Sequence, residues 1–333
     1  MPSRYERITN SKKAKNDEFY TLYDDIASEL PNYKKYLANK RIICPCDWDE
    51  SFEEEIVYSD GEYYDGDNLF SQGDTVKNID ILKTRKKFEK DLNLVKCNFV
   101  KFLVAHAEDY KIKSITVSGY DPQSDKGVKF QNLNYSNYDL VITNPPFSLF
   151  IDFIETMFKN KMDFIVIGPQ HAVAYKEVFK HIKENEMWMG YNYHLLGFQL
   201  PDGTVLPKND NLPRSCGWYT NLPVKYRNDK LILTEEYSKE LYPHYDNFDG
   251  IDVSKTKLIP KDYDGYMGVP ITFLQKYNPD QFEIVGMGTG DTAKEIGITK
   301  NYRGRTDLAF TKDGKNQCPY GRIVIKNKEV EKW

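Results

Sequence analysis

Short apolar runs alternate with amphipathic stretches through the first half of the chain, and each kind predicts a different element. The apolar, β-branched runs lie at 41–47, 114–119, 140–143 and 163–168, and such runs are typical of buried parallel strands. The amphipathic stretches lie at 24–30, 98–106, 148–159 and 175–183, and they predict helices. Strands that alternate with helices in this way predict an α/β fold with a parallel, doubly wound sheet and right-handed crossovers.

The pattern changes after Met189. Segments 191–200 and 217–222 look like antiparallel strands, joined by a loop rich in proline, asparagine and aspartate. From about residue 226 the chain is irregular and aromatic, with many turn signals and short strands such as 322–326. We therefore predict a first domain at 1–225 and a second, mostly irregular and β-rich domain at 226–333.

In residues 283–291 an apolar strand runs into a glycine-rich turn, a pattern that resembles a cofactor-binding loop. Only about forty residues follow it, too few for the strand–helix units of a complete cofactor-binding half. We therefore expect a loop of the second domain here.

Residues 53–92 interrupt the alternation of strands and helices. The run 55–64 carries a hairpin signal centred on Asp60 and Gly61. Asp65, Asp67 and Asp74 are spaced too irregularly for a calcium-binding EF-hand loop. We therefore expect a polar surface insertion.

The most informative stretch is 139–147, in which a buried strand stops abruptly at Asn144, Pro145, Pro146 and Phe147. Neither proline can donate a backbone hydrogen bond, so the loop offers an amide oxygen and carbonyl oxygens beside a flat aromatic ring. Such a loop suits a planar substrate with an NH2 group, such as the exocyclic amine of a purine. An ordinary strand-to-helix turn would have the same pattern, and the residues alone leave both interpretations open.

Other polar residues follow the neighbouring predicted strands. Cys46 and Asp47 end the first strand, and Tyr120 and Asp121 follow the second. Ligands of parallel sheets bind at the carboxyl ends of strands, so we expect these residues to converge with the Asn144–Phe147 loop on one cleft.

Composition narrows the class of protein. Hydrophobic residues make up 40% of the 333 residues, with no apolar run long enough for a membrane span and no leader-like segment, so we expect a cytoplasmic protein without a membrane partner. The five cysteines are scattered, which indicates a reducing compartment. Cys44 and Cys46 have no second ligand pair at zinc spacing, so we expect no metal site.

The net charge of −4 argues against an indiscriminate, strongly basic nucleic-acid binder. Residues 291–333 nevertheless hold ten Lys and Arg against six Asp and Glu, a local excess of four positive charges. A phosphate-facing surface and a merely solvated tail both fit this excess.

Taken together, several motifs resemble the DNA adenine-N6 methyltransferases, and among them the EcoRI-type adenine-specific family. The matching segments are 17–21, 44–47, 98–99, 144–147, 268–273 and 277–282, spread over most of the chain. Asn144-Pro-Pro-Phe147 is fairly specific to amino-group methyltransferases, whereas the other segments gain weight from their order.

The resemblance implies a Rossmann-like catalytic domain, S-adenosylmethionine as methyl donor, and a C-terminal region that reads double-stranded DNA. It implies catalytic roles for the Asn144–Phe147 loop, with the target adenine flipped out of the duplex. The residues implied at the methionine end of the cofactor are Phe19, Tyr20 and Thr21, with Cys44, Pro45, Cys46 and Asp47 in the turn beneath it. Tyr120 and Asp121 are assigned near the ribose or adenine by position alone. Candidate DNA contacts are Arg303, Arg305, Lys312 and Arg322, although surface solvation explains any one of them as well.

Two departures from the family pattern stand out. The usual glycine-rich turn is missing after the first strand, and the insertion 53–92 separates Asp47 from Asn98. The insertion fits a DNA clamp, a partner site or decoration. An Asn-Pro-Pro methyltransferase acting on RNA or on a protein glutamine, and a catalytically silent DNA-binding homologue, remain alternatives. Oligomeric state stays open.

Overall fold

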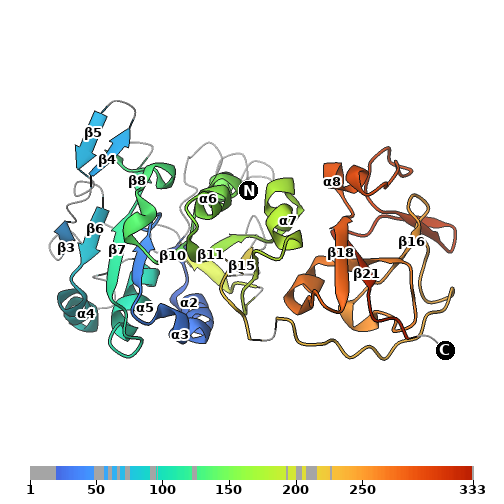
Figure 1. Cartoon of the computed structure of the whole chain (residues 1–333), viewed down its shortest axis with the longest axis horizontal. Coiled ribbons are helices and arrows are strands. Elements are labelled where there is room, and N and C mark those ends of the chain that lie inside the picture. The colour runs from blue at the N-terminus through green and yellow to red at the C-terminus, as the bar shows by residue number, and fades with distance from the viewer. Residues whose placement is uncertain are drawn as a thin grey trace, which may run out of the picture. The chain divides into compact units, whose positions relative to one another are not determined.

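The computed structural model describes residues 20–48, 56–58, 62–65, 68–71, 76–90, 95, 97–121, 126–192, 194–199, 205–207, 216–225 and 227–331. They form a mixed α/β protein with several sheets (Figure 1). The chain divides into two compact units. The first comprises Met1–Gln170 and Met189–Leu222, and the second comprises His171–Trp188 and Pro223–Trp333. Residues 171–188, which we placed in the first domain, therefore group with the second unit.

The main sheet of the first unit has eight strands, in the order β12-β15-β11-β10-β2-β7-β6-β3. Their bounds, in the same order, are Trp188–Met189, Cys216–Thr220, Asp163–Pro169, Leu140–Thr143, Arg41–Cys44, Ser114–Ser118, Val76–Ile79 and Ile56–Tyr58. Strands β11, β10, β2 and β7 are parallel. Strand β15 runs antiparallel to β11, and β6 runs antiparallel to β7.

The four parallel strands are those that the apolar runs predict. Every residue of β10 is buried, and in β2, β7 and β11 only the first residue is partly exposed. Strands buried at consecutive positions are covered on both faces, which explains why they read as continuous apolar runs. The helices of this unit are α2 (Tyr23–Glu29), α3 (Lys34–Leu37), α4 (Ile81–Lys90), α5 (Asn98–His106) and α6 (Phe150–Lys159).

Chain order places a switch point between β2 and β10. From β2 the chain proceeds to β7 on one side, then returns to β10 on the other side of β2 and continues to β11. Ligand sites of open α/β sheets lie outside the carboxyl ends of strands at such a reversal. The segments that follow β2 and β10 are 45–48 and 144–147, both singled out from the sequence.

Strands β3 and β6 of the insertion 53–92 join the main sheet, whereas the sequence predicts a polar surface insertion. Strand β3 pairs with β6 and not with β4, so the hairpin centred on Asp60 and Gly61 was wrong. Strand β4 (Glu62–Asp65) pairs with β5 (Asn68–Ser71) instead, around the next aspartate–glycine pair of the sequence. A local turn signal could not reveal that β6 would extend the sheet beside β7.

A second, three-stranded sheet completes the first unit, in the order β1-β13-β14. The strands are Tyr20–Thr21, Gly197–Gln199 and Val205–Pro207. Segment 191–200 therefore pairs through β13 with the start of the chain, whereas β15 joins the main sheet. A small ladder of β8 (Tyr120–Asp121) and β9 (Lys126–Gly127) follows β7.

The second unit has its own sheet, in the order β16-β17-β21-β18. The strands are Gly250–Asp252, Tyr266–Pro270, Arg322–Asn327 and Phe282–Met287, and the helices are α7 (Lys176–Lys183) and α8 (Gly290–Glu295). A hairpin of β19 (Phe310–Lys312) and β20 (Lys315–Gln317) lies in the same unit. The run 283–291 is thus a strand followed by a turn and a short helix, and not a simple loop.

Short 3-10 turns connect these elements: Leu30–Tyr33, Phe130–Asn132, Tyr135–Asn137, Phe147–Leu149, Gln170–Ala174, Thr256–Leu258 and Ile271–Lys276. Within the described part of the chain, no helix is both long and apolar enough to cross a membrane.

Candidate active site

The Asn144–Phe147 loop leaves the carboxyl end of β10 and turns directly into a 3-10 helix. Pro145 is buried, and Asn144, Pro146 and Phe147 are half-buried. The Leu149 N–H donates to the Pro146 carbonyl over 2.9 Å, which closes the turn that follows the two prolines. The loop is therefore an ordered, partly covered turn at the edge of the sheet.

Phe150 anchors the loop on its downstream side. Its side chain is only 1% exposed and lies against Gly168 at the end of β11. A Cβ at Gly168 would approach the Phe150 ring to 2.3 Å, so only glycine admits this contact. The ring also packs against Tyr219, with centroids 5.2 Å apart. These contacts set where α6 begins.

Asp47 joins the ends of three parallel strands. Its N–H donates to the carbonyl of Ser118, which ends β7, over 3.1 Å. Its carboxyl group accepts a hydrogen bond from the hydroxyl of Thr143, which ends β10. The Cys46 N–H donates to the same Thr143 oxygen over 3.2 Å. The structure therefore brings Cys46, Asp47 and the start of the Asn144–Phe147 loop together.

The Asp47 side chain is buried, and its burial raises the pKa of the carboxyl group to about 7. Hydrogen bonds from Thr143, from the Cys97 thiol and from the Asn144 N–H oppose this rise in pKa by stabilising the anion. Asp47 thus faces the Asn144–Phe147 loop and the residue that precedes α5.

Strand β1 brings the predicted cofactor residues Tyr20 and Thr21 into the first unit. The Asn98 side-chain amide donates to the Thr21 carbonyl over 2.8 Å, so β1 is tied to the first turn of α5. The Thr21 hydroxyl is buried and has no hydrogen-bond partner among the described residues. Phe19 lies outside the described residues.

Phe198 connects β1 to the Asn144–Phe147 loop. In the ladder of β1 and β13 it lies opposite Thr21. Its ring meets the Phe147 ring edge to face, with centroids 6.0 Å apart and planes at 71°. Phe198 was not predicted from the sequence, because only the pairing of two distant segments places it here.

Helix α2 holds the segment that leads to β13. Glu29 is fully buried and accepts hydrogen bonds from the N–H groups of Tyr191 and Asn192 over 2.8 and 2.7 Å. One turn earlier, Asp25 accepts the Leu196 N–H over 2.8 Å. The four-residue spacing places Asp25 and Glu29 on one face of the helix, but it does not reveal which distant segment they bind.

Tyr120 and Asp121 form β8, directly after the end of β7. Gly127, opposite Tyr120, has φ +87°, and a Cβ there would clash with the Gly119 carbonyl oxygen at 2.1 Å. The Lys129 ammonium lies 4.9 Å from the centroid of the Tyr120 ring. The structure thus places Tyr120 at the predicted edge of the sheet, with a cation over its ring.

The cysteines of the first turn carry no nucleophilic character. Burial raises the pKa of the Cys44 and Cys46 thiols well above their usual value, and the nearby Asp47 carboxyl adds to the rise. Both side chains remain neutral thiols at physiological pH, as expected for structural cysteines.

The predicted DNA contacts of the second unit differ from one another. Arg303, Arg305 and Lys312 are exposed. Arg322 instead has a side chain only 11% exposed, and its guanidinium bonds the Asp252 carboxylate over 2.7 Å. Arg322 was therefore wrongly chosen as a surface contact, because it forms a buried ion pair within the sheet.

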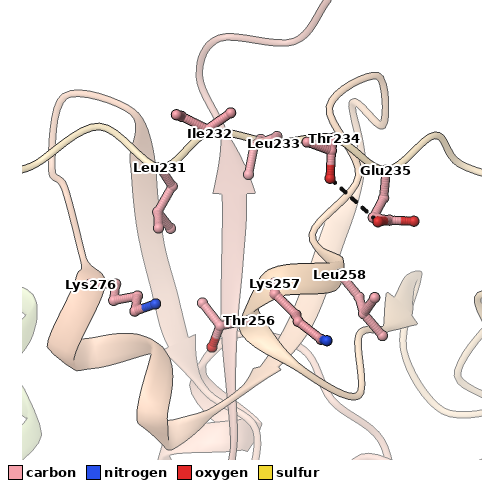
Figure 2. A pocket seen from close by; sticks show the side chains of 9 residues that line it. All are labelled: Leu231, Ile232, Leu233, Thr234, Glu235, Thr256, Lys257, Leu258 and Lys276. Atoms are coloured by element: carbon pink, nitrogen blue, oxygen red, sulfur yellow. Dashed lines mark hydrogen bonds between the residues drawn. The ribbon is translucent and has the colours of Figure 1, made fainter.

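Two further features of the second unit include none of the predicted site residues. A hollow of about 280 Å³ opens beneath the extended segment 231–235, above Thr256 and the side chains of Lys257 and Lys276 (Figure 2). His181, Glu184 and Glu186 bring potential metal-ligand atoms within 4.8 Å of one another. The 2.6 Å contact from Nδ1 of the buried His181 to the Glu186 carboxylate accounts for the closeness of these two side chains.

An Asn-Pro-Pro-Phe loop at the carboxyl edge of a parallel sheet, at its switch point and in contact with Phe198 of β13, is the arrangement expected from the resemblance to amino-group methyltransferases. Comparison with known sequences specifies the class further. The family profile described as adenine-specific methyltransferase EcoRI matches residues 7–60 and 130–328. The chain belongs to this family.

Two curated relatives match almost the whole chain. The type II methyltransferase M.EcoRI of Escherichia coli is 35% identical over 353 aligned positions, which cover 98% of this chain and 97% of that protein. The type II methyltransferase M.MpnI of Mycoplasma pneumoniae is 32% identical over 343 positions, with 97% and 98% coverage. No solved structure gave a significant match.

Proposed function

We propose that the protein transfers a methyl group from S-adenosylmethionine to N6 of an adenine flipped out of double-stranded DNA, as part of site-specific DNA marking such as restriction–modification. The observation that carries this proposal is the ordered Asn144–Phe147 loop, whose Phe147 ring contacts Phe198 of β13, the residue opposite Thr21. The names of its relatives, type II methyltransferases, support DNA as the substrate. In this proposal the first unit is the catalytic, Rossmann-like domain, and the second unit recognises DNA.

The residues around β1 fit S-adenosylmethionine. The methionine end of this cofactor carries an ammonium and a carboxylate group, and the buried Thr21 hydroxyl is available to bond either of them. Tyr20 and Thr21 would hold this end of the cofactor, above the turn Cys44–Asp47. Tyr120 would lie near the ribose or adenine. The cofactor supplies an electrophilic methyl group on its sulfonium.

Asn144 and Pro145 would orient the nucleophile. The lone pair of an adenine amino group is delocalised into its ring, so the nitrogen is a poor nucleophile. Hydrogen bonds from the amino group to the Asn144 side-chain oxygen and the Pro145 carbonyl would hold it in line for transfer and favour tetrahedral nitrogen. Pro146 has no N–H group with which to compete for these acceptors.

Phe147 would hold the flipped base. Extrusion of a base from a duplex costs a few kcal/mol in lost stacking and pairing, which stacking on an aromatic ring partly offsets. The Phe147 ring is half-buried, and Phe198 contacts it edge to face. The contact restrains the Phe147 ring.

The loop 301–307 of the second unit is the best supported DNA contact. Asn301 Oδ1 accepts the N–H groups of Arg303 and Arg305 over 2.8 and 3.3 Å, so the loop is a preformed turn with two exposed arginines. Tyr302 and Tyr320 are exposed by 48% and 79%. Basic residues interleaved with exposed aromatic rings suit phosphates and bases. Lys312 adds a further exposed cation.

Labelled methyl transfer to mixed-sequence duplex DNA, followed by nucleoside analysis, tests the proposal. N6-methyladenine in the product is the expected result. Label in RNA or protein glutamine but not in DNA would overturn the substrate assignment. Cofactor binding without transfer to any of these three would instead support a silent DNA-binding homologue.

A further inference from the structure

The Asp47 carboxyl group lies where the proposed cofactor turn and the proposed catalytic loop meet. It receives three hydrogen bonds, from the Thr143 hydroxyl, the Asn144 N–H and the Cys97 thiol. These donors come from the end of β10, the first residue of the loop and the residue preceding α5. The three donors use much of the capacity of two carboxylate oxygens.

The Thr143 hydroxyl is fixed in direction by its two partners. It donates to Asp47 and accepts the Cys46 N–H over 3.2 Å, so the ends of β2 and β10 are joined in both directions. Thr143 is fully buried, and water does not substitute for either bond.

The bond from the Asn144 N–H has a specific consequence. It fixes the peptide plane between Thr143 and Asn144, from which the Asn144 side chain departs. The next two residues are prolines with restricted φ and no N–H, so they add no backbone bond of this kind. The Asp47 contact is therefore a hydrogen bond that restrains the backbone where the loop begins.

We propose that Asp47 and Thr143 are positioning residues for methyl transfer, which hold the Asn144 backbone so that its side-chain oxygen meets the substrate amine in reactive geometry. Cys97 supports the same carboxylate from the side of α5. This inference rests on the proposed function and assigns Asp47 a role different from the cofactor contact that the sequence predicts. A displacement of about 1 Å in such a site lowers the rate by about a hundredfold.

Single-turnover methylation of duplex DNA tests the roles of these residues. Thr143→Val keeps the shape of the side chain and removes the hydroxyl, whereas Thr143→Ser keeps the hydroxyl. We expect Thr143→Val to lower the transfer rate by at least tenfold, with cofactor affinity, measured by calorimetry, within about threefold of wild type. Thr143→Ser should transfer within about threefold of wild type.

Thr220→Val is the matched control. Thr220 is also a fully buried strand threonine of this sheet, and its hydroxyl donates to the Phe164 carbonyl over 2.7 Å. We expect a similar loss of stability with an unchanged transfer rate. Equal rates for Thr143→Val and Thr220→Val would overturn the positioning role.

Hydrogen exchange provides a readout that does not depend on activity. The two prolines carry no amide hydrogen, so exchange over residues 144–146 reports the Asn144 N–H alone. We expect this hydrogen to exchange at least tenfold faster in Asp47→Asn and Thr143→Val than in wild type and Thr220→Val. Unchanged protection would contradict the inference.

A second pair keeps the test decisive if Thr143→Val does not fold. Cys97→Ala removes the third donor, and Cys97→Ser restores one. If the Asn144 N–H exchanges faster in Cys97→Ala but not in Cys97→Ser, the positioning role of Asp47 is supported. Identical exchange in the two variants refutes it. Failure of wild type to methylate DNA would count against the proposed function, whereas these exchange rates judge Asp47 separately.

Discussion

Phe147 and Phe198 meet edge to face, and through this contact the Asn144–Phe147 loop touches the strand that pairs with β1. The two rings lie on segments that are distant in sequence. Phe198 is buried, whereas Phe147 is half-buried. The buried ring therefore serves as a support for the one that we expect to contact the substrate.

Phe198→Leu should impair methyl transfer more than cofactor binding. The substitution keeps an apolar side chain, so the loss of stability should stay near about 1 kcal/mol, while the edge-to-face support of Phe147 is removed. We expect the Michaelis constant for DNA to rise about tenfold. Steady-state methylation and calorimetric titration of cofactor measure the two effects, and equal losses would argue against this support role.

Asn144→Ala should abolish most activity. Loss of one acceptor for the substrate amine removes an interaction that strengthens during transfer, so the rate should fall by about a hundredfold or more. Cofactor affinity should remain close to wild type, because Asn144 is not among the residues proposed to hold the cofactor. Near-normal transfer would disprove the catalytic assignment.

Arg41 and Asp139 should make stability depend on acid pH. Two bonds of 3.0 and 2.8 Å join the guanidinium to the carboxylate, and Arg41 lowers the pKa of Asp139 to about 2. In the unfolded chain this pKa is about 4, so the pair stabilises the fold fully above pH 4 and loses its effect as the pH falls towards 2.

Urea denaturation of Asp139→Asn should therefore show a loss of about 1–2 kcal/mol at pH 7. The difference from wild type should shrink as the pH falls from 4 to 2. A difference that did not change with pH would assign the loss to packing instead of the ion pair.

Arg303 and Arg305 should contribute to the salt dependence of DNA binding. Removing one phosphate-binding side chain reduces the slope of log affinity against log salt by about 0.9, so Arg303→Gln with Arg305→Gln should reduce it by about 2. Lys239→Gln, an exposed cation outside the 301–307 loop, is the control. Equal slopes for wild type and the double variant would place the DNA contact elsewhere.

Local patterns predicted the parallel strands well, because β10 and its neighbours are buried on both faces and therefore read as continuous apolar runs. A local pattern gave the wrong partner for β3. The turn signal at Asp60 and Gly61 predicted pairing with the next segment of the sequence, but β3 pairs with β6.

Some residues of the candidate site could likewise be predicted from local sequence, and others could not. The Asn144–Phe147 loop could be predicted because its chemistry is contained in four consecutive residues. The sequence could not predict the roles of Thr143, Glu29 and Phe198, because these roles depend on partners that only the tertiary structure brings close. Arg322 shows the converse error, since charge in the sequence does not reveal a buried partner such as Asp252.

The pairing of β1 with β13 also bears on how the protein matures. Asp25 and Leu196, which share a hydrogen bond, are 171 positions apart, and Thr21 pairs with Phe198. During synthesis the first strand must wait until more than half of the chain has been made before its partner exists. Contacts of such long range form slowly, so the pairing of β1 with β13 should be a late step in folding. A nascent chain that ends before Gly197 would already contain β1 and the Asn144–Phe147 loop. It would lack β13, the strand that holds Thr21 in position.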